Sequence, residues 1–200
     1  MKNMSRLPVL CFFAFALFFI SCKRSIKNRQ ELILYVNDPA NGLEKEQQIG
    51  KVNAKMTYKP WQLFKQSGGV MDNQTNKKER YLFDDKLFFV LSLSANNKEL
   101  LKQLDFNKYS EMVQVLSFRM KDFMGIVSGD AKPVEPLDCI FQQTYGMGRS
   151  NDLLIVFNRN ALNVNGTLKL YLKEFGLKIG NLEFDFQADD INAIPNDITN

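Results

Sequence analysis

Two pairs of carboxylates are the residues best suited to do chemistry in this sequence. They are Asp84 with Asp85, and Glu44 with Glu46. Glycoside hydrolysis uses two carboxyl groups about 5 to 9.5 Å apart across a cleft. Sequence neighbours on a strand usually point to opposite faces of the sheet, so these pairs do not predict such a cleft. We therefore predict no catalytic residue and keep a carboxylate-based hydrolase as an alternative.

Two further stretches look superficially like ligand-binding loops. Four side chains near the C-terminus could offer oxygens to calcium: Asp185, Asp189, Asp190 and Asn192. The fixed odd spacing and the glycine turn of a calcium loop are missing there. The stretch 146–150 is rich in glycine but lacks the Gly-Lys-Ser/Thr ending of a phosphate loop. We predict a solvated strand end and a hairpin turn, with no metal and no cofactor.

Four aromatic residues beside expected loops form the candidate ligand surface. They are Tyr58, Trp61, Phe64 and Tyr81. Aromatic side chains beside loops often bind sugars or peptides, because they combine a large apolar face with a polar handle. The alternative is ordinary core and rim packing, which is more common in small sandwich domains.

The chain contains no histidine, and its charges are mixed along the sequence. The missing histidine removes the Ser-His-Asp and Cys-His nucleophile systems and the usual zinc sites. The formal net charge is +4, without the basic face that nucleic-acid binding needs. A non-catalytic protein without a nucleic-acid partner is therefore the favoured class.

The first 21 residues have the pattern of an export signal. Lys2 and Arg6 give a basic start, and the run 7–20 is apolar. A helix that crosses a bilayer needs about 20 apolar residues, so this run is short for a permanent span. The run ends in Phe19, Ile20, Ser21 and Cys22.

This ending resembles the lipobox of bacterial lipoproteins, with Phe19 in place of the commoner leucine. The resemblance covers residues 1–22. It implies that cleavage follows Ser21 and that a diacylglycerol is attached to the Cys22 thiol. Two or three acyl chains hold a protein on a membrane essentially permanently. An ordinary secretory signal and an uncleaved anchor are the alternatives.

Removal of residues 1–21 leaves 179 residues, which suit one domain. We predict a basic tether over 22–30 and a single β-sandwich domain over 31–200. Of the three cysteines, Cys11 is lost with the signal and Cys22 is acylated, so Cys139 stands alone. Its apolar neighbours predict an inert, buried thiol.

Short apolar runs between Asn, Asp, Gly and Pro residues predict a protein made mainly of strands. Expected strands cover 32–36, 52–58, 87–93, 124–127, 139–145, 153–157, 167–172 and 182–186. The run 87–93 is expected to be central, because it is apolar almost throughout. Asn96 or Asn97 could cap a short helix that ends near Phe106. The stretch 109–123 suits either a helix or a strand, and its β-branched and aromatic residues favour a strand.

Eight or nine short strands at this spacing predict an antiparallel, immunoglobulin-like β-sandwich with one or two short helices. A barrel is the next alternative. The stretches 35–43 and 157–159 also loosely resemble uncharacterised lipoproteins of Bacteroidota. In that group acidic residues after the cysteine direct export to the cell surface, and here Lys23 and Arg24 stand there. The resemblance therefore implies an outer-membrane position that faces the periplasm.

Three functions remain from the sequence. The leading one is a lipid-anchored, non-catalytic module that binds a protein or glycan at the cell envelope. A carboxylate-based envelope glycan hydrolase would need a cleft with two convergent carboxylates of raised pKa. A structural assembly factor would show an exposed apolar patch or a long unpaired edge strand.

Overall fold

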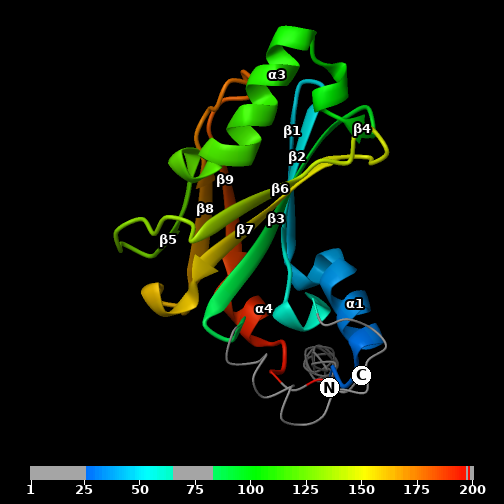
Figure 1. Cartoon of the computed structure of the whole chain (residues 1–200). Coiled ribbons are helices and arrows are strands. Elements are labelled where there is room, and N and C mark those ends of the chain that lie inside the picture. Colours follow the sequence, from blue (N-terminus) through cyan, green and yellow to red (C-terminus); the bar gives the residue numbers. More distant parts are fainter. Residues whose placement is uncertain (1–25, 65–82, 197, 199–200) are drawn as a thin grey trace, which may run out of the picture.

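The computed structural model describes residues 26–64, 83–196 and 198 (Figure 1). The expected signal, Ser21, Cys22 and Tyr81 lie outside the described residues. The strands are β1 (Glu44–Ile49), β2 (Val52–Tyr58), β3 (Lys86–Ala95), β4 (Lys98–Glu99), β5 (Met124–Ser128), β6 (Asp138–Gln142), β7 (Asn151–Asn158), β8 (Thr167–Leu172) and β9 (Leu182–Gln187). The α-helices are α1 (Arg29–Asn37), α3 (Phe106–Gln114) and α4 (Ala188–Asn192). The shorter helical turns are η1 (Pro39–Asn41), η2 (Trp61–Phe64), η3 (Leu101–Gln103), η4 (Val115–Arg119), η5 (Met120–Phe123) and η6 (Arg159–Ala161).

The strands form two antiparallel sheets, which confirms the predicted mainly β sandwich. One sheet has the order β1-β2-β3-β7-β6, with β4 paired to β3, and the other has the order β5-β8-β9. In an immunoglobulin constant domain the orders are A-B-E-D and C-F-G. Here β2-β3-β7-β6 and β5-β8-β9 reproduce those two orders, and β1 is an added edge strand. The helices α1, α3 and α4 exceed the one or two that were expected.

A single large hydrophobic cluster fills the space between the sheets. Its members come from both sheets, as the contact between the Phe89 and Phe186 rings shows, with centroids 5.2 Å apart. In β3 and β9 buried and more exposed residues alternate, because successive side chains of a strand point to opposite faces. β3 pairs with both β2 and β7, which confirms its predicted central place.

The stretch 109–123 is helical, so the preferred strand prediction was wrong. The Asp105 side chain accepts a hydrogen bond from the Lys108 amide at 3.0 Å and caps the start of α3. Met112, Leu116 and Met120 are all buried and follow helical spacing. Burial of this face outweighs the strand preference of Val113 and Val115. Helical turns continue from α3 through η4 and η5 and close one end of the sandwich (Figure 1).

The first predicted strand, 32–36, was also wrong, because this segment belongs to α1. Asn28 caps the helix by accepting a hydrogen bond from the Glu31 amide at 2.9 Å. Leu32 and Val36 lie four residues apart and are both buried, as one face of a helix requires. Ile26 is buried as well, so the packed structure already includes residues that were expected to form the tether.

The remaining strand predictions at 52–58, 87–93, 124–127, 153–157, 167–172 and 182–186 correspond to β2, β3, β5, β7, β8 and β9. The strand expected over 139–145 ends at Gln142 and continues as a loop. Asn96 and Asn97 have positive φ and form the turn between β3 and β4 instead of capping a helix. β1 was not predicted, because its sequence EKEQQI is polar except for Ile49.

Within the described ranges, no helix has the length and apolar character needed to cross a membrane.

Candidate functional site

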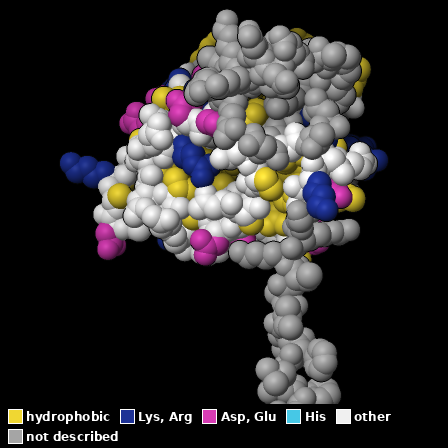
Figure 2. Space-filling model, turned by 90° about the horizontal axis from the view of Figure 1, so that it is seen from below, with side chains coloured by type: hydrophobic (Ala, Val, Ile, Leu, Met, Phe, Trp, Pro, Cys, Tyr) yellow, Lys and Arg dark blue, Asp and Glu magenta, His cyan; other side chains and the backbone are white. Residues whose placement is uncertain are grey.

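A pocket of about 260 Å³ opens at the end of the sandwich where α1 and α4 lie. β2 ends there, β3 begins there, and the turn after β7 closes one side. The lining residues are Tyr58, Trp61, Gln62, Asp84, Lys86, Arg159, Ile191, Asn192, Ile194, Pro195 and Asn196. Figure 2 views this end of the molecule and shows apolar side chains with both basic and acidic side chains around them.

The pocket contains two of the four predicted aromatic residues. Tyr58 and Trp61 both line it, and Phe64 lies in the same helical turn as Trp61 but outside the lining. Phe64 has 45% of its surface exposed, and its ring packs against Phe88 with centroids 5.1 Å apart. The structure therefore brings together the described members of the predicted surface, although only two of them reach the pocket.

Trp61 is mainly a packing residue. It stacks on Phe83 with ring centroids 6.4 Å apart, and together with Phe88 and Val156 it forms a second hydrophobic cluster. Only 7% of Trp61 is exposed, so its ring forms a wall of the pocket and offers little face to a ligand. This cluster fits the alternative that the sequence favoured, namely ordinary packing.

Hydrogen bonds fix the helical turn that carries Trp61 and Gln62. The Arg29 guanidinium donates to the backbone oxygens of Gln62 and Leu63 at 3.0 and 2.9 Å. The Gln62 side-chain amide donates to the Pro195 carbonyl at 2.8 Å. This Arg29 clasp therefore joins α1, η2 and the C-terminal segment, which are far apart in sequence, around one side of the pocket.

Tyr58 and Arg159 contribute a hydroxyl and a guanidinium to the wall of the pocket. Burial raises the pKa of Tyr58 to about 12, and the nearby Arg159 charge lowers it only in part. The phenol is therefore neutral and can donate a hydrogen bond at all physiological pH values. Arg159 donates to Asn192 Oδ1 at 2.6 Å and has no ion-pair partner within the described residues. Its other N–H groups can bind a ligand oxyanion.

Acceptors also line the pocket. Gln62 is buried, and its Oε1 has no hydrogen-bond partner in the described part of the chain. A buried polar group without a partner costs free energy, and this oxygen is enclosed by the protein. Asp84 adds a carboxylate to the wall, and Lys86 is paired with Asp85 at 2.6 Å. The arrangement suits a small ligand with both an anionic oxygen and hydroxyl or amine donors.

The four carboxylates considered from the sequence lie in different parts of the structure. Only Asp84 of the four lines the pocket. On β1, Glu44 lies 3.3 Å from Lys55, and Glu46 accepts a hydrogen bond from Asn53. These contacts engage both glutamates with neighbouring strand residues.

The two loop-like stretches take other roles. Among the described residues, no group of three or more His, Cys, Asp or Glu side chains could hold a metal ion. Asn192 binds Arg159 in the pocket wall. The stretch 146–150 lies in the hairpin connection between β6 and β7, as predicted. Cys139 is half-buried, and burial raises the pKa of its thiol to about 12, which makes it a poor nucleophile.

Sequence reasoning missed Gln62, Arg159 and Asn192 as pocket residues. They lie up to 130 residues apart along the chain and meet only because β2, β7 and α4 end at the same place. The strand end 157–159 was singled out for its resemblance alone, and no local pattern marks Arg159 as a ligand-binding residue. Comparison of the chain with protein-family models, with curated proteins and with solved structures finds no match in any of the three.

Proposed function

We propose that the protein is a lipid-anchored lipoprotein of the cell envelope whose sandwich domain is a non-catalytic binding module. The observation that carries the binding role is the convergence of the Tyr58 hydroxyl and the Arg159 guanidinium on one pocket. The ligand class that fits is a small, oxygen-rich molecule with a carboxylate or phosphate group, such as an acidic sugar of an envelope glycan. The Asn196 side-chain amide lines the same pocket and can bind its hydroxyl groups.

The position of the first packed residues supports a membrane-proximal pocket. Ile26 is buried and lies four residues after Cys22. Four extended residues span at most about 14 Å, so acyl chains on Cys22 would hold the α1 end of the sandwich close to the bilayer. The outer membrane, with the domain on its periplasmic side, is the location we propose from Lys23 and Arg24.

Metabolic labelling with a lipid analogue tests the anchor. Wild-type protein should incorporate the label and stay with the membrane fraction, and Cys22→Ala should lose both properties. Cys139→Ala is the matched control, because it removes a cysteine that we do not expect to be acylated. If Cys22→Ala stays uncleaved on the membrane, residues 7–20 act as a protein anchor and the lipoprotein proposal is wrong. Protease treatment of intact cells tests the location, because a periplasmic domain should survive it.

Calorimetry on the mature protein in detergent tests the pocket. Titration with glucuronate and glucose 6-phosphate, with glucose as the neutral counterpart, should show binding of an acidic sugar only. Arg159→Met should weaken that binding by about tenfold, because it removes a charge-assisted hydrogen bond. Arg149→Met is the control, because this exposed arginine lies outside the pocket lining. Equal affinity of the Arg159→Met and wild-type proteins would refute the proposed ligand site.

The two alternatives differ in what supports them. The hydrolase needs convergent carboxylates of raised pKa. The carboxylates with a shifted pKa among the described residues, Glu99 and Glu174, are both shifted downward. An assembly role needs exposed apolar side chains, and several large ones are exposed at the α3 end of the molecule. A role in protein interaction is therefore the second candidate function.

A further inference from the structure

A buried carboxylate organises the loop between β6 and β7. Glu99 is only 3% exposed, and it accepts hydrogen bonds from the Gly146 and Gly148 amides, both at 2.8 Å. Two side chains, those of Thr144 and Asn151, donate to the same carboxylate. Burial alone would raise the pKa of Glu99, but the four hydrogen bonds outweigh it and lower the pKa below its ordinary value. The loop is therefore held in one conformation around an internal anion.

This loop projects two large side chains into solvent. Tyr145 has a φ of +52°, a left-handed conformation that favours glycine, and 69% of the residue is exposed. Met147 is 88% exposed. Non-glycine residues keep such a conformation where the surrounding structure imposes it, and this is often at functional sites. Here the hydrogen bonds to Glu99 on either side of Tyr145 impose it.

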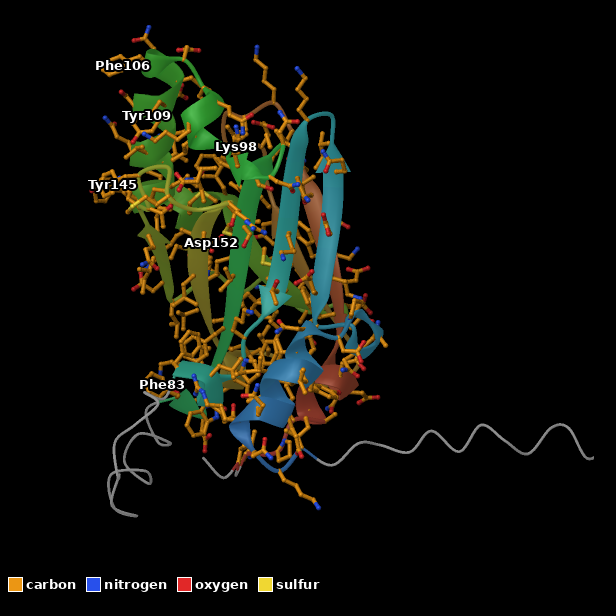
Figure 3. The ribbon with its side chains drawn as sticks, turned by 90° about the vertical axis from the view of Figure 1, so that its right-hand side faces the viewer. Phe83, Lys98, Phe106, Tyr109, Tyr145 and Asp152 are labelled. Carbon is orange, nitrogen blue, oxygen red and sulfur yellow. The ribbon has the colours of Figure 1, made fainter. Side chains whose placement is uncertain are left out.

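The start of α3 adds a third exposed apolar side chain. Phe106 is 81% exposed, and Figure 3 shows it projecting on the same side of the molecule as Tyr145. Lys102 lies close to the loop, because a Cβ built on Gly146 would lie 2.8 Å from Lys102 Cε, and Phe106 is four residues further along the chain, at the start of α3. We call Phe106, Tyr145 and Met147 the distal aromatic surface. It lies at the opposite end of the sandwich from α1 and α4 (Figure 1).

Basic and acidic side chains both lie around this surface, and they differ in whether they have partners. Lys98, Lys102 and Arg149 are exposed, and none has an ion-pair partner among the described residues. The acidic groups nearby have internal partners. Asp105 accepts a hydrogen bond from the Lys108 amide, and Asp152 accepts one from the Ser150 hydroxyl. Glu111 is paired with Lys108 at 2.7 Å, and Glu174 accepts hydrogen bonds from the amides of its own loop.

We propose that the distal aromatic surface docks an acidic segment of a partner protein that carries apolar side chains. Unpaired cations around the three apolar residues complement such a segment. A protein fits better than a glycan, because Met147 and Phe106 offer apolar contact without hydrogen bonds for sugar hydroxyls. This inference deepens the interaction role proposed above, but it depends neither on the pocket ligand nor on the anchor.

Fluorescence anisotropy with two labelled peptides tests the proposal on the mature protein in detergent. The peptides share the same leucines and phenylalanines, and one has glutamates where the other has lysines. We expect the acidic peptide to bind and the basic peptide to bind at least tenfold more weakly. The double variant Tyr145→Ala, Met147→Ala should reduce acidic-peptide binding by about tenfold, as expected for exposed anchor residues. Glu99→Gln should also reduce it, because the loop loses its organising charge while Tyr145 and Met147 remain.

Two controls make the outcome decisive. Leu34→Ala removes an exposed leucine of α1 at the other end of the molecule, and it should leave peptide binding unchanged. Arg159→Met should do the same, so loss of sugar binding and loss of peptide binding report on different sites. Equal binding of both peptides, or wild-type affinity in the Tyr145→Ala, Met147→Ala variant, would overturn the proposal. Binding of an anionic polysaccharide or of anionic vesicles in place of the acidic peptide would also overturn it.

Discussion

The two ends of the sandwich use large apolar and aromatic side chains in opposite ways. At the α1 end Tyr58 and Trp61 are buried and form the walls of a small polar pocket. At the α3 end Phe106, Tyr145 and Met147 are among the most exposed large hydrophobic residues of the described chain. Similar residue types therefore form the walls of the pocket where they are enclosed, and they form the proposed docking surface where a loop and a helix start project them. Exposure, and not composition, separates the two roles.

The largest expected difference between the ends is in stability. Trp61→Ala should lower the free energy of unfolding by about 3 kcal/mol or more, because it empties the centre of a buried cluster. Tyr145→Ala should change that free energy by less than about 0.5 kcal/mol, because its side chain is exposed. Urea unfolding followed by circular dichroism measures both. A large effect of Tyr145→Ala would show that the α3 end is a packing region as well.

The second largest effect is expected at Glu99, which holds the loop between β6 and β7 without being one of its exposed side chains. Glu99→Ala should destabilise the protein by about 2 to 3 kcal/mol, because the Gly146 and Gly148 amides lose their acceptor. The hairpin between β6 and β7 should then exchange its amide hydrogens faster, while η2 at the other end keeps its protection. Hydrogen exchange followed by mass spectrometry gives this comparison. Uniform loss of protection at both ends would contradict a local role for Glu99.

The sequence could predict the strands better than the helices. Alternation identified β2, β8 and β9, and a continuous apolar run identified β3. The helix α3 was missed because Val113 and Val115 favour strands. The burial of Met112 favours the helix, but this burial depends on tertiary packing and cannot be seen in the sequence. The strand β1 was missed because its polar sequence pairs with β2 only once both are in place.

The site was predictable only in part, for a similar reason. Tyr58 and Trp61 could be identified, because aromatic residues beside a Pro turn are visible locally. Arg159 and Asn192 could not, since they reach the pocket through the ends of β7 and α4. The role of Glu99 was also invisible, because its partners lie 45 or more residues further along the chain.

Alkaline pH should lower the stability of the protein through Tyr58 at the pocket end. The folded pKa of Tyr58 is raised from 10.0 to about 12, so the folded state holds this proton more tightly than the unfolded state. The resulting loss of stability therefore begins above pH 10 and reaches about 2 kcal/mol near pH 12. Trp61 is the only tryptophan of the chain, so its fluorescence reports on this end. Tyr58→Phe should reduce the alkaline loss, and an unchanged loss would assign it to another group such as Cys139.

Acidic pH should lower the stability of the protein through Glu99 at the α3 end. This is the smallest of the four expected effects. The folded pKa of Glu99 lies below its ordinary value of 4.5, so the unfolded state binds more protons between those two pKa values. The stability that Glu99 contributes is complete above pH 4.5 and is lost as pH falls through its folded pKa. Glu99→Gln should therefore flatten the acid part of the stability curve. Glu174, whose pKa is also lowered, should preserve part of the slope, and an unchanged slope would exclude Glu99 as a source.

The Arg29 clasp also determines how the domain responds to mechanical force. A pull on the chain before Ile26 reaches α1 first, and α1 is joined to η2 by the two Arg29 hydrogen bonds and through Gln62 to Pro195. The buried Leu32 and Val36 also hold α1 in the core, whereas the paired strands of the sheets share a load among many backbone hydrogen bonds. Tension at the N-terminus would therefore act first on α1 and on the wall of the pocket, and only afterwards on the paired strands.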